Sequence, residues 1–202
     1  MKISSYLTKP IYYGTRLLLS VAIIVFSIQG DWISVVNTFL ILLLTILPSL
    51  LRKKFKFYFP FELDVLISIF IFISLFLGSV QDYYERFPIL DVILHFKSGL
   101  LLGIVGFILV HLLNHGSSKK IYLSPLFISI FAVSFSMGLS VIWEIYEYTI
   151  DTVWGFQTQE TGLPDTMGDL ILNTIGALIV SVSGYFWMKK EHKIPFTPGD
   201  ID

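Results

Sequence analysis

Six long runs of apolar residues limit how this 202-residue chain can fold. A transmembrane helix needs about 20 apolar residues, and 19 residues rise ~28 Å as a helix, close to the ~30 Å hydrocarbon core of a bilayer. Because backbone polar groups in lipid must hydrogen-bond internally, the runs predict helices rather than strands. The sequence therefore predicts an all-α membrane protein with six transmembrane helices. The predicted spans cover residues 11–29, 31–51, 62–80, 89–113, 121–148 and 165–188.

Composition supports the membrane assignment and limits the number of domains. Hydrophobic residues make up 54% of the chain and charged residues only 14%, whereas a soluble domain carries about 25% charged residues. Six spans leave about 80 residues for the termini and connections, so we expect one six-span domain over residues 1–202. A net charge of −1 gives no reason to expect a nucleic-acid partner. The absence of cysteine excludes disulfides and thiolate metal ligands.

Lysine and arginine residues predict the orientation of the chain, because cytoplasmic loops of membrane proteins are enriched in them. They gather before span 1, between spans 2 and 3, between spans 4 and 5, and after span 6. The other three connections contain a single cation, Arg86. We therefore expect both termini in the cytoplasm. The cations on that side are Lys2, Lys9, Arg52, Lys53, Lys54, Lys56, Lys119, Lys120, Lys189, Lys190 and Lys193.

Polar residues of spans 4, 5 and 6 fall on one face of each predicted helix, because residues three or four apart share a face. Spans 1 and 2 carry few polar residues. The predicted orientation places the acids of spans 4–6 in the outer third of the membrane or at its outer surface. Five glycines in these spans would allow the helices to approach closely, so we expect a shared pocket. The glycines are Gly99, Gly103, Gly106, Gly138 and Gly176, and the polar stripes include Asp91, His95, Ser98, Ser136, Ser140, Glu144, Glu147, Asp151, Asp165, Asp169 and Asn173.

The charge of this pocket predicts a bound cation. Carboxylates this close together cannot all stay ionised without a proton or a cation. Oxygen ligands with one imidazole suit a divalent metal such as Mg²⁺, Mn²⁺ or Zn²⁺. Glu144 and His95 are also the candidate catalytic residues, because a carboxylate or an imidazole can move a proton. The predicted metal ligands are a subset of His95, Glu144, Glu147, Asp165 and Asp169, supported by Asp91 and Asn173.

Structural alternatives exist for these positions. Asp165 would cap the N-terminus of span 6, and Asp91 would favour the positive end of span 4. Asp151 is expected to face water, and His111, at the inner end of span 4, is expected to be solvated. The deeper pocket residues would, in the alternative interpretation, form a hydrogen-bond network that only joins the helices.

At these residues the sequence resembles the VanZ-like superfamily, and most closely its YjdF-type branch of small bacterial membrane-spanning proteins. The resemblance covers about residues 85–185. It implies a multi-pass protein of the bacterial cytoplasmic membrane, but no particular reaction. Typical members of the superfamily have Glu-x2-Gln at the second motif and an arginine before the third, and this chain has neither. The motifs are Asp91-x3-His95-x3-Gly99, Glu144-x2-Glu147 and Asp165-x3-Asp169-x3-Asn173-x2-Gly176-Ala177.

Three classes of function are compatible with the sequence. The leading one is a metal-dependent hydrolase or transferase that acts on a lipid-linked envelope intermediate. A second is a proton- or cation-coupled transporter, in which the carboxylates form a relay. A third is a non-catalytic partner in an envelope complex, whose polar stripes only join helices. The lipid bilayer is the expected surrounding in each case.

Overall fold

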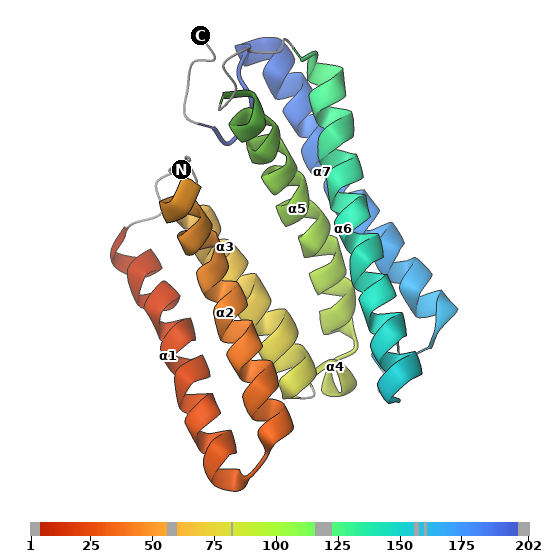
Figure 1. Ribbon diagram of the computed structural model, residues 1–202. Helices are drawn as coiled ribbons and strands as arrows, with labels where there is room; N and C mark the ends of the chain where they lie inside the picture. The colour runs from red at the N-terminus through yellow and green to blue at the C-terminus, as the bar shows by residue number, and fades with distance from the viewer. Residues whose placement is uncertain are drawn as a thin grey trace. The chain divides into compact units, whose positions relative to one another are not determined.

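The computed structural model describes residues 5–55, 60–81, 83–115, 123–155, 158–159 and 161–197. Every regular element among these residues is helical (Figure 1). A π-helical segment, η1 (Phe72–Val80), continues α3 without a break. The α-helices are α1 (Ser5–Gln29), α2 (Trp32–Phe55), α3 (Phe61–Ile71), α4 (Tyr83–Arg86), α5 (Ile89–His115), α6 (Pro125–Trp154) and α7 (Leu163–Glu191).

Six of these helical segments are long and apolar enough to cross a membrane, which confirms the prediction of an all-α fold with six spans. α3 and η1 together form the third of them, over residues Phe61–Val80. Most of their boundaries fall within a few residues of the predicted ones, because the apolar runs themselves define the helices.

Span 5 differs most from its predicted bounds of 121–148, of which residues 121 and 122 lie outside the described part of the chain. α6 begins at Pro125 because the Ser124 hydroxyl caps it, accepting a hydrogen bond of 3.2 Å from the N–H of Phe127. At its other end the helix continues to Trp154, where Gly155 stops it. Gly155 adopts a left-handed conformation (φ 71°), and its N–H bonds to the carbonyl of Asp151.

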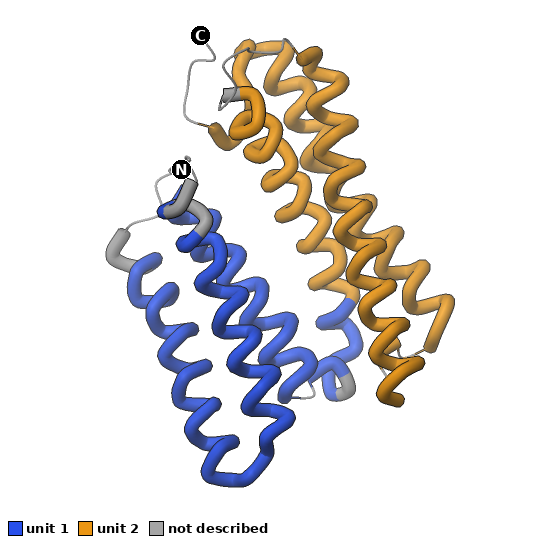
Figure 2. Tube along the Cα trace, viewed as in Figure 1, with its two compact units in different colours: residues 1–91 blue, residues 92–202 orange. Residues whose placement is uncertain are grey.

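The chain divides into two compact units, with the boundary between Asp91 and Val92 (Figure 2). Unit 1 contains α1, α2, α3, η1 and α4, and unit 2 contains α6, α7 and nearly all of α5. Because the boundary falls inside α5, Asp91 belongs to the same continuous helix as the unit 2 residues that follow it.

Unit 1 buries polar residues as well as an apolar core. Leu19 and Ile41, from α1 and α2, pack with Phe76 of η1 in the core. Thr45 of α2 and Asp64 of α3 are both fully buried. The interior of unit 1 is thus more polar than the few polar residues of spans 1 and 2 had indicated.

Glycines bring the helices of unit 2 into backbone contact. A Cβ at Gly99 of α5 would lie 2.0 Å from a carbonyl oxygen of α7, and one at Gly176 of α7 would lie 2.3 Å from a carbonyl oxygen of α5. Gly106 faces the backbone of α6, and Gly103 faces a valine side chain of α7 at 3.3 Å. Four of the five expected close approaches are therefore confirmed. Gly138 is the exception, because its Cβ would have no neighbour within 4 Å.

His111 is buried in unit 2, with 7% of its surface exposed, so the expectation of a solvated side chain was wrong. The reason is its helical position. His111 follows the core residue Phe107 by four positions, so both lie on the face of α5 that packs inside the unit.

Asp31 caps the N-terminus of α2, which makes the stability of this end of the helix pH-dependent. Its Oδ1 accepts a hydrogen bond of 3.1 Å from the N–H of Ser34. The hydrogen bonds from the side chain and backbone of Ser34 lower the pKa of Asp31 from its ordinary value of 3.8. A lowered folded-state pKa means that this stabilisation is complete above the unfolded-state pKa and disappears as the pH falls through the folded-state value.

We therefore expect Asp31→Ala to lower the thermal unfolding temperature at neutral pH and to leave it unchanged in acid below both pKa values. Circular dichroism melts of the wild type and the variant at the two pH values measure the difference. An equal loss of stability at both pH values would show that the ionisation of Asp31 adds nothing to the stability that its side chain provides.

Candidate functional site

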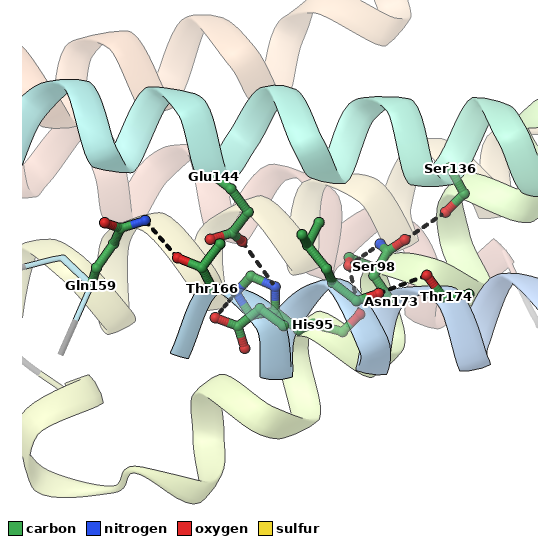
Figure 3. Close-up of polar contacts among 10 residues, drawn as sticks. His95, Ser98, Ser136, Glu144, Gln159, Thr166, Asn173 and Thr174 are labelled. Carbon is green, nitrogen blue, oxygen red and sulfur yellow. Dashed lines mark hydrogen bonds and ion pairs between the residues drawn. The ribbon is translucent and has the colours of Figure 1, made fainter. Parts of the chain in front are cut away.

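His95 lies between two carboxylates inside unit 2. Its Nδ1 is 4.0 Å from Oε1 of Glu144 on α6, and its Nε2 is 3.8 Å from Oδ2 of Asp169 on α7. Figure 3 shows Glu144 pointing from α6 toward the imidazole of His95. Glu144 is only 4% exposed and Asp169 only 5%. The two ring nitrogens therefore face carboxylates from two different helices.

The close approach of α5 and α7 explains why His95 and Asp169 meet. His95 precedes Gly99 by one helical turn, and Asp169 precedes Gly176 by two turns. Because the two glycines place the backbones in contact, side chains on the N-terminal side of the crossing are close enough to interact.

Asp91 completes a group with the spacing of metal ligands. Asp91, His95 and Asp169 each offer one ligand atom, and these atoms all lie within 4.8 Å of one another. Asp91 and His95 are four residues apart on α5 and share one face of that helix. Metal–ligand bonds in proteins are about 2.0–2.6 Å long, so two ligands on opposite sides of one ion lie about 4–5 Å apart. Two carboxylates and one imidazole would leave coordination positions open for water or substrate.

Glu144 lies beside the other ring nitrogen of His95, outside the group of Asp91, His95 and Asp169 that could hold a metal ion. A metal-bound imidazole commonly donates its second N–H to a carboxylate, which fixes the orientation of the ring and makes it a better ligand. With Nε2 on the side of Asp169, Nδ1 faces Glu144. Glu144 is thus positioned to orient His95, or to accept a proton from a molecule bound next to it.

Asn173 links all three helices below this cluster. Its Nδ2 donates to Oγ of Ser98 on α5 at 2.8 Å, and its Oδ1 accepts from Oγ of Ser136 on α6 at 3.2 Å (Figure 3). Ser98 in turn donates to the carbonyl of His95 at 2.7 Å. Asn173 is 1% exposed. This network connects the backbone of His95 to α6 and α7, and the supporting role of Asn173 at a metal site stays a prediction.

Asp151 is half-buried and holds the connection between α6 and α7, whereas its polar surroundings in the sequence had predicted that it faces water. Its carboxylate accepts hydrogen bonds of 2.9 Å from the N–H groups of Thr158 and Gln159, and one of 2.7 Å from the Thr158 hydroxyl. Gln159 also donates to the hydroxyl of Thr166 on α7 at 2.7 Å (Figure 3). Sequence reasoning missed this contact set because the residues lie in an irregular connection, where no periodic pattern reveals which atoms meet.

Replacing Asp151 is expected to release this connection without unfolding the helices. Asp151→Ala removes the acceptor of two backbone N–H groups, so we expect their hydrogen exchange to accelerate by roughly tenfold or more, as a lost hydrogen bond of more than about 1.4 kcal/mol implies. Hydrogen–deuterium exchange at Thr158 and Gln159 is the measurement. Thr149→Val is the matched control, because among the described residues the Thr149 hydroxyl bonds within α6, to the carbonyl of Ile145. Unchanged exchange in Asp151→Ala would contradict the assignment.

Two further predicted ligands, Glu147 and Asp165, are half-buried about one turn from Glu144 and Asp169. They lie outside the group of ligand atoms within 4.8 Å, and their role as ligands stays a prediction. Gly162 and not Asp165 is the N-cap of α7, and Asp165 lies in the first turn of the helix, where a negative charge is favourable.

Comparison with known proteins identifies relatives of this chain. Residues 11–190 match a family described as "Predicted membrane protein (DUF2238)". A protein of Thermotoga maritima, described as "Uncharacterized protein", is 24% identical over 183 residues, which cover 86% of this chain and 92% of the relative. No solved structure matches the chain.

Proposed function

We propose that this chain, which belongs to the DUF2238 family of predicted membrane proteins, binds a divalent metal ion with Asp91, His95 and Asp169. The observation that carries the proposal is the grouping of their ligand atoms within 4.8 Å. The position of the Glu144 carboxylate at the other nitrogen of His95 supports it. Mg²⁺, Mn²⁺ and Zn²⁺ fit this combination of ligands.

The reaction that suits this site is a hydrolase or transferase reaction on a lipid-linked substrate. A divalent ion supplies a Lewis acid that polarises a phosphoryl or ester oxygen. Glu144 would act as the general base, because its carboxylate is buried beside His95 and can accept a proton directly from a molecule bound at the site. The cluster lies near the ends of helices long enough to cross a membrane, where the headgroup of a lipid-linked molecule would be found.

The location that goes with this function is the outer leaflet of the bacterial cytoplasmic membrane. The distribution of lysine and arginine supports this placement, because it puts the N-terminal ends of α5 and α7 outside. The likeness of residues 91–177 to the VanZ-like motifs supports a bacterial envelope role.

Metal analysis of the full-length protein, purified in detergent, tests the site. Mass spectrometry should find a metal near one equivalent in the wild type and none in Glu144→Ala/Asp169→Ala. No metal in the wild type, even after Mg²⁺, Mn²⁺ and Zn²⁺ have been offered, would overturn the proposal. Turnover of a panel of lipid phosphates and its loss on addition of EDTA tests the reaction separately.

A further inference from the structure

Positive charge gathers at the end of unit 1 where α1 begins and α2 ends. Lys9 of α1 and Lys53 of α2 are both exposed there, and Arg16 lies two turns further along α1. Among the described residues, none of these three cations forms an ion pair with a carboxylate. The acids at the same end are Glu62 and Asp64 of α3. The described part of this end therefore carries more basic than acidic residues.

The contacts between α1 and α2 fix how the two helices are aligned. The hydroxyls of Tyr12 on α1 and Ser49 on α2 are in direct hydrogen-bond contact. One turn further along α1, Nη2 of Arg16 donates to the carbonyl of Thr45 at 2.6 Å. A step of four residues forward on α1 is thus matched by a step of four residues back on α2, so the helices lie side by side and antiparallel (Figure 1).

This alignment places the two lysines next to each other. Lys9 precedes Tyr12 by three residues, and Lys53 follows Ser49 by four. Residues three or four apart share a helix face, so both lysines lie about one turn beyond the contact between Tyr12 and Ser49, on the faces that meet. Two ammonium groups in neighbouring positions repel each other, and an anion bound between them removes that repulsion.

Aromatic side chains indicate how deep the lysines lie in the membrane. Tyr13 is 63% exposed, and its ring meets the ring of Tyr12 edge-on with the centroids 5.2 Å apart. The guanidinium of Arg16 reaches back along α1 and lies 3.6 Å from the centre of the Tyr12 ring. Exposed tyrosines and long basic side chains that reach toward a helix end are typical of the boundary between hydrocarbon and water. Lys9 and Lys53 are one turn beyond this level, where lipid headgroups are found.

An exposed apolar stripe leads away from each lysine along its own helix. Exposed apolar side chains recur every three or four residues, which places them on one face. Such a face of a transmembrane helix contacts the acyl chains of lipids. The stripe of α1 contains Tyr13, Leu17, Val21 and Ile24, and the stripe of α2 contains Leu50, Leu47, Leu43 and Leu40.

We propose that Lys9 and Lys53 bind the phosphate of an acidic phospholipid, and that Arg16 strengthens this lipid site with a third positive charge. Each ammonium group offers three N–H donors to the phosphate oxygens, so one phosphate is held by two helices. The two acyl chains lie along the stripes of α1 and α2. A zwitterionic lipid binds less well because its own ammonium group is repelled by the lysines. The lipid site belongs to unit 1 and is separate from the metal site proposed for unit 2.

Native mass spectrometry of the full-length protein in detergent tests the proposal, with phosphatidylglycerol and phosphatidylcholine of identical acyl chains as the probes. The wild type should bind phosphatidylglycerol more tightly. Each basic residue near an anionic lipid surface contributes roughly fivefold to binding, so Lys9→Gln/Lys53→Gln should bind phosphatidylglycerol about 30-fold more weakly. Equal affinity of the wild type for the two lipids would overturn the proposal.

Lys189→Gln/Lys190→Gln is the matched control, because it removes two exposed lysines from the end of α7 in unit 2. It should keep the wild-type affinity for phosphatidylglycerol. A loss equal to that of Lys9→Gln/Lys53→Gln would show a general attraction between cations and acidic lipid and would overturn the site. Lys9→Arg/Lys53→Arg keeps both charges and should also keep the affinity, whereas a 30-fold loss would contradict recognition of the phosphate by charge.

Glycerophosphoglycerol distinguishes a lipid from a soluble phosphate. It is the headgroup of phosphatidylglycerol without acyl chains, so at the same concentration it should not displace the lipid. Displacement would assign the site to a soluble phosphate compound and overturn the lipid proposal. None of these variants changes a residue of the proposed metal site, so the two proposals succeed or fail independently.

Discussion

Gly99→Val is expected to be the most destabilising single substitution in unit 2. The first side-chain carbon at this position would lie 2.0 Å from the carbonyl oxygen of Asn173 and 3.0 Å from the backbone nitrogen of Ala177. Because these atoms belong to the backbone of α7, they cannot rotate away as a flexible side chain would. The helices would have to separate, which breaks the Asn173 network and moves His95 away from Asp169. We expect a loss of about 3 kcal/mol or more, at the upper end of the range for overpacking.

Thermal unfolding in detergent measures this loss, and Gly138→Ala is its matched control. Gly138 also lies inside a membrane-crossing helix, but a Cβ there would meet nothing within 4 Å. Alanine is better than glycine in a helix by about 1 kcal/mol, so the control should melt at or above the wild-type temperature. If Gly99→Val unfolds at the same temperature as the wild type, the backbone contact between α5 and α7 is not present in the protein.

Asp169→Asn should cause the largest loss of metal affinity, and Glu144→Gln a smaller one. Asp169 would bind the ion directly, and an amide oxygen provides no negative charge to balance it. Glu144 would act through Nδ1 of His95, and loss of such an outer partner costs roughly 10–100-fold in affinity. We expect Glu144→Gln to fall in that range and Asp169→Asn to exceed it.

Isothermal titration of Mn²⁺ or Zn²⁺ into the purified protein gives both affinities. Glu191→Gln is the control, because Glu191 is an exposed acid at the end of α7 that pairs with Lys190. An equal loss in Asp169→Asn and Glu144→Gln would make Glu144 a direct ligand. Wild-type metal affinity in both Asp169→Asn and Glu144→Gln would contradict the proposed metal site.

The sequence predicted the six spans because each apolar run is long enough to define a helix by itself. It also placed His95 on the polar stripe of span 4 and Asp169 on the polar stripe of span 6, since spacing of three or four residues determines a helix face. Which ring nitrogen faces which carboxylate depends on the rotation of α6 and α7 around α5 and on side-chain rotamers. The spacing of residues in the sequence determines neither of these. The structure was therefore needed to show that Glu144 lies near Nδ1 of His95 and Asp169 near Nε2.

The contacts of Asp64 with Tyr12 and Ser49 show why the sequence did not reveal the buried polar residues of unit 1. Tyr12, Ser49 and Asp64 lie on three different helices, separated by 37 and 15 residues along the chain. Each is an isolated polar residue near the end of an apolar run, and a single polar residue gives no periodic pattern. In unit 2, several polar residues repeat along each helix, which made the stripes visible.

The length of α6 makes the bilayer itself a candidate regulator of the proposed metal site. α6 has 30 residues, or about 45 Å of helix, against about 30 Å of hydrocarbon. The 19 residue steps from Pro125 to Glu144 alone span about 28 Å, so the last turns of the helix project into the headgroup layer. Lipids with longer acyl chains would thicken the hydrocarbon core toward Glu144 and make it harder for a hydrated cation to reach His95. We therefore expect tail length to tune metal affinity, weakest in the thickest membranes.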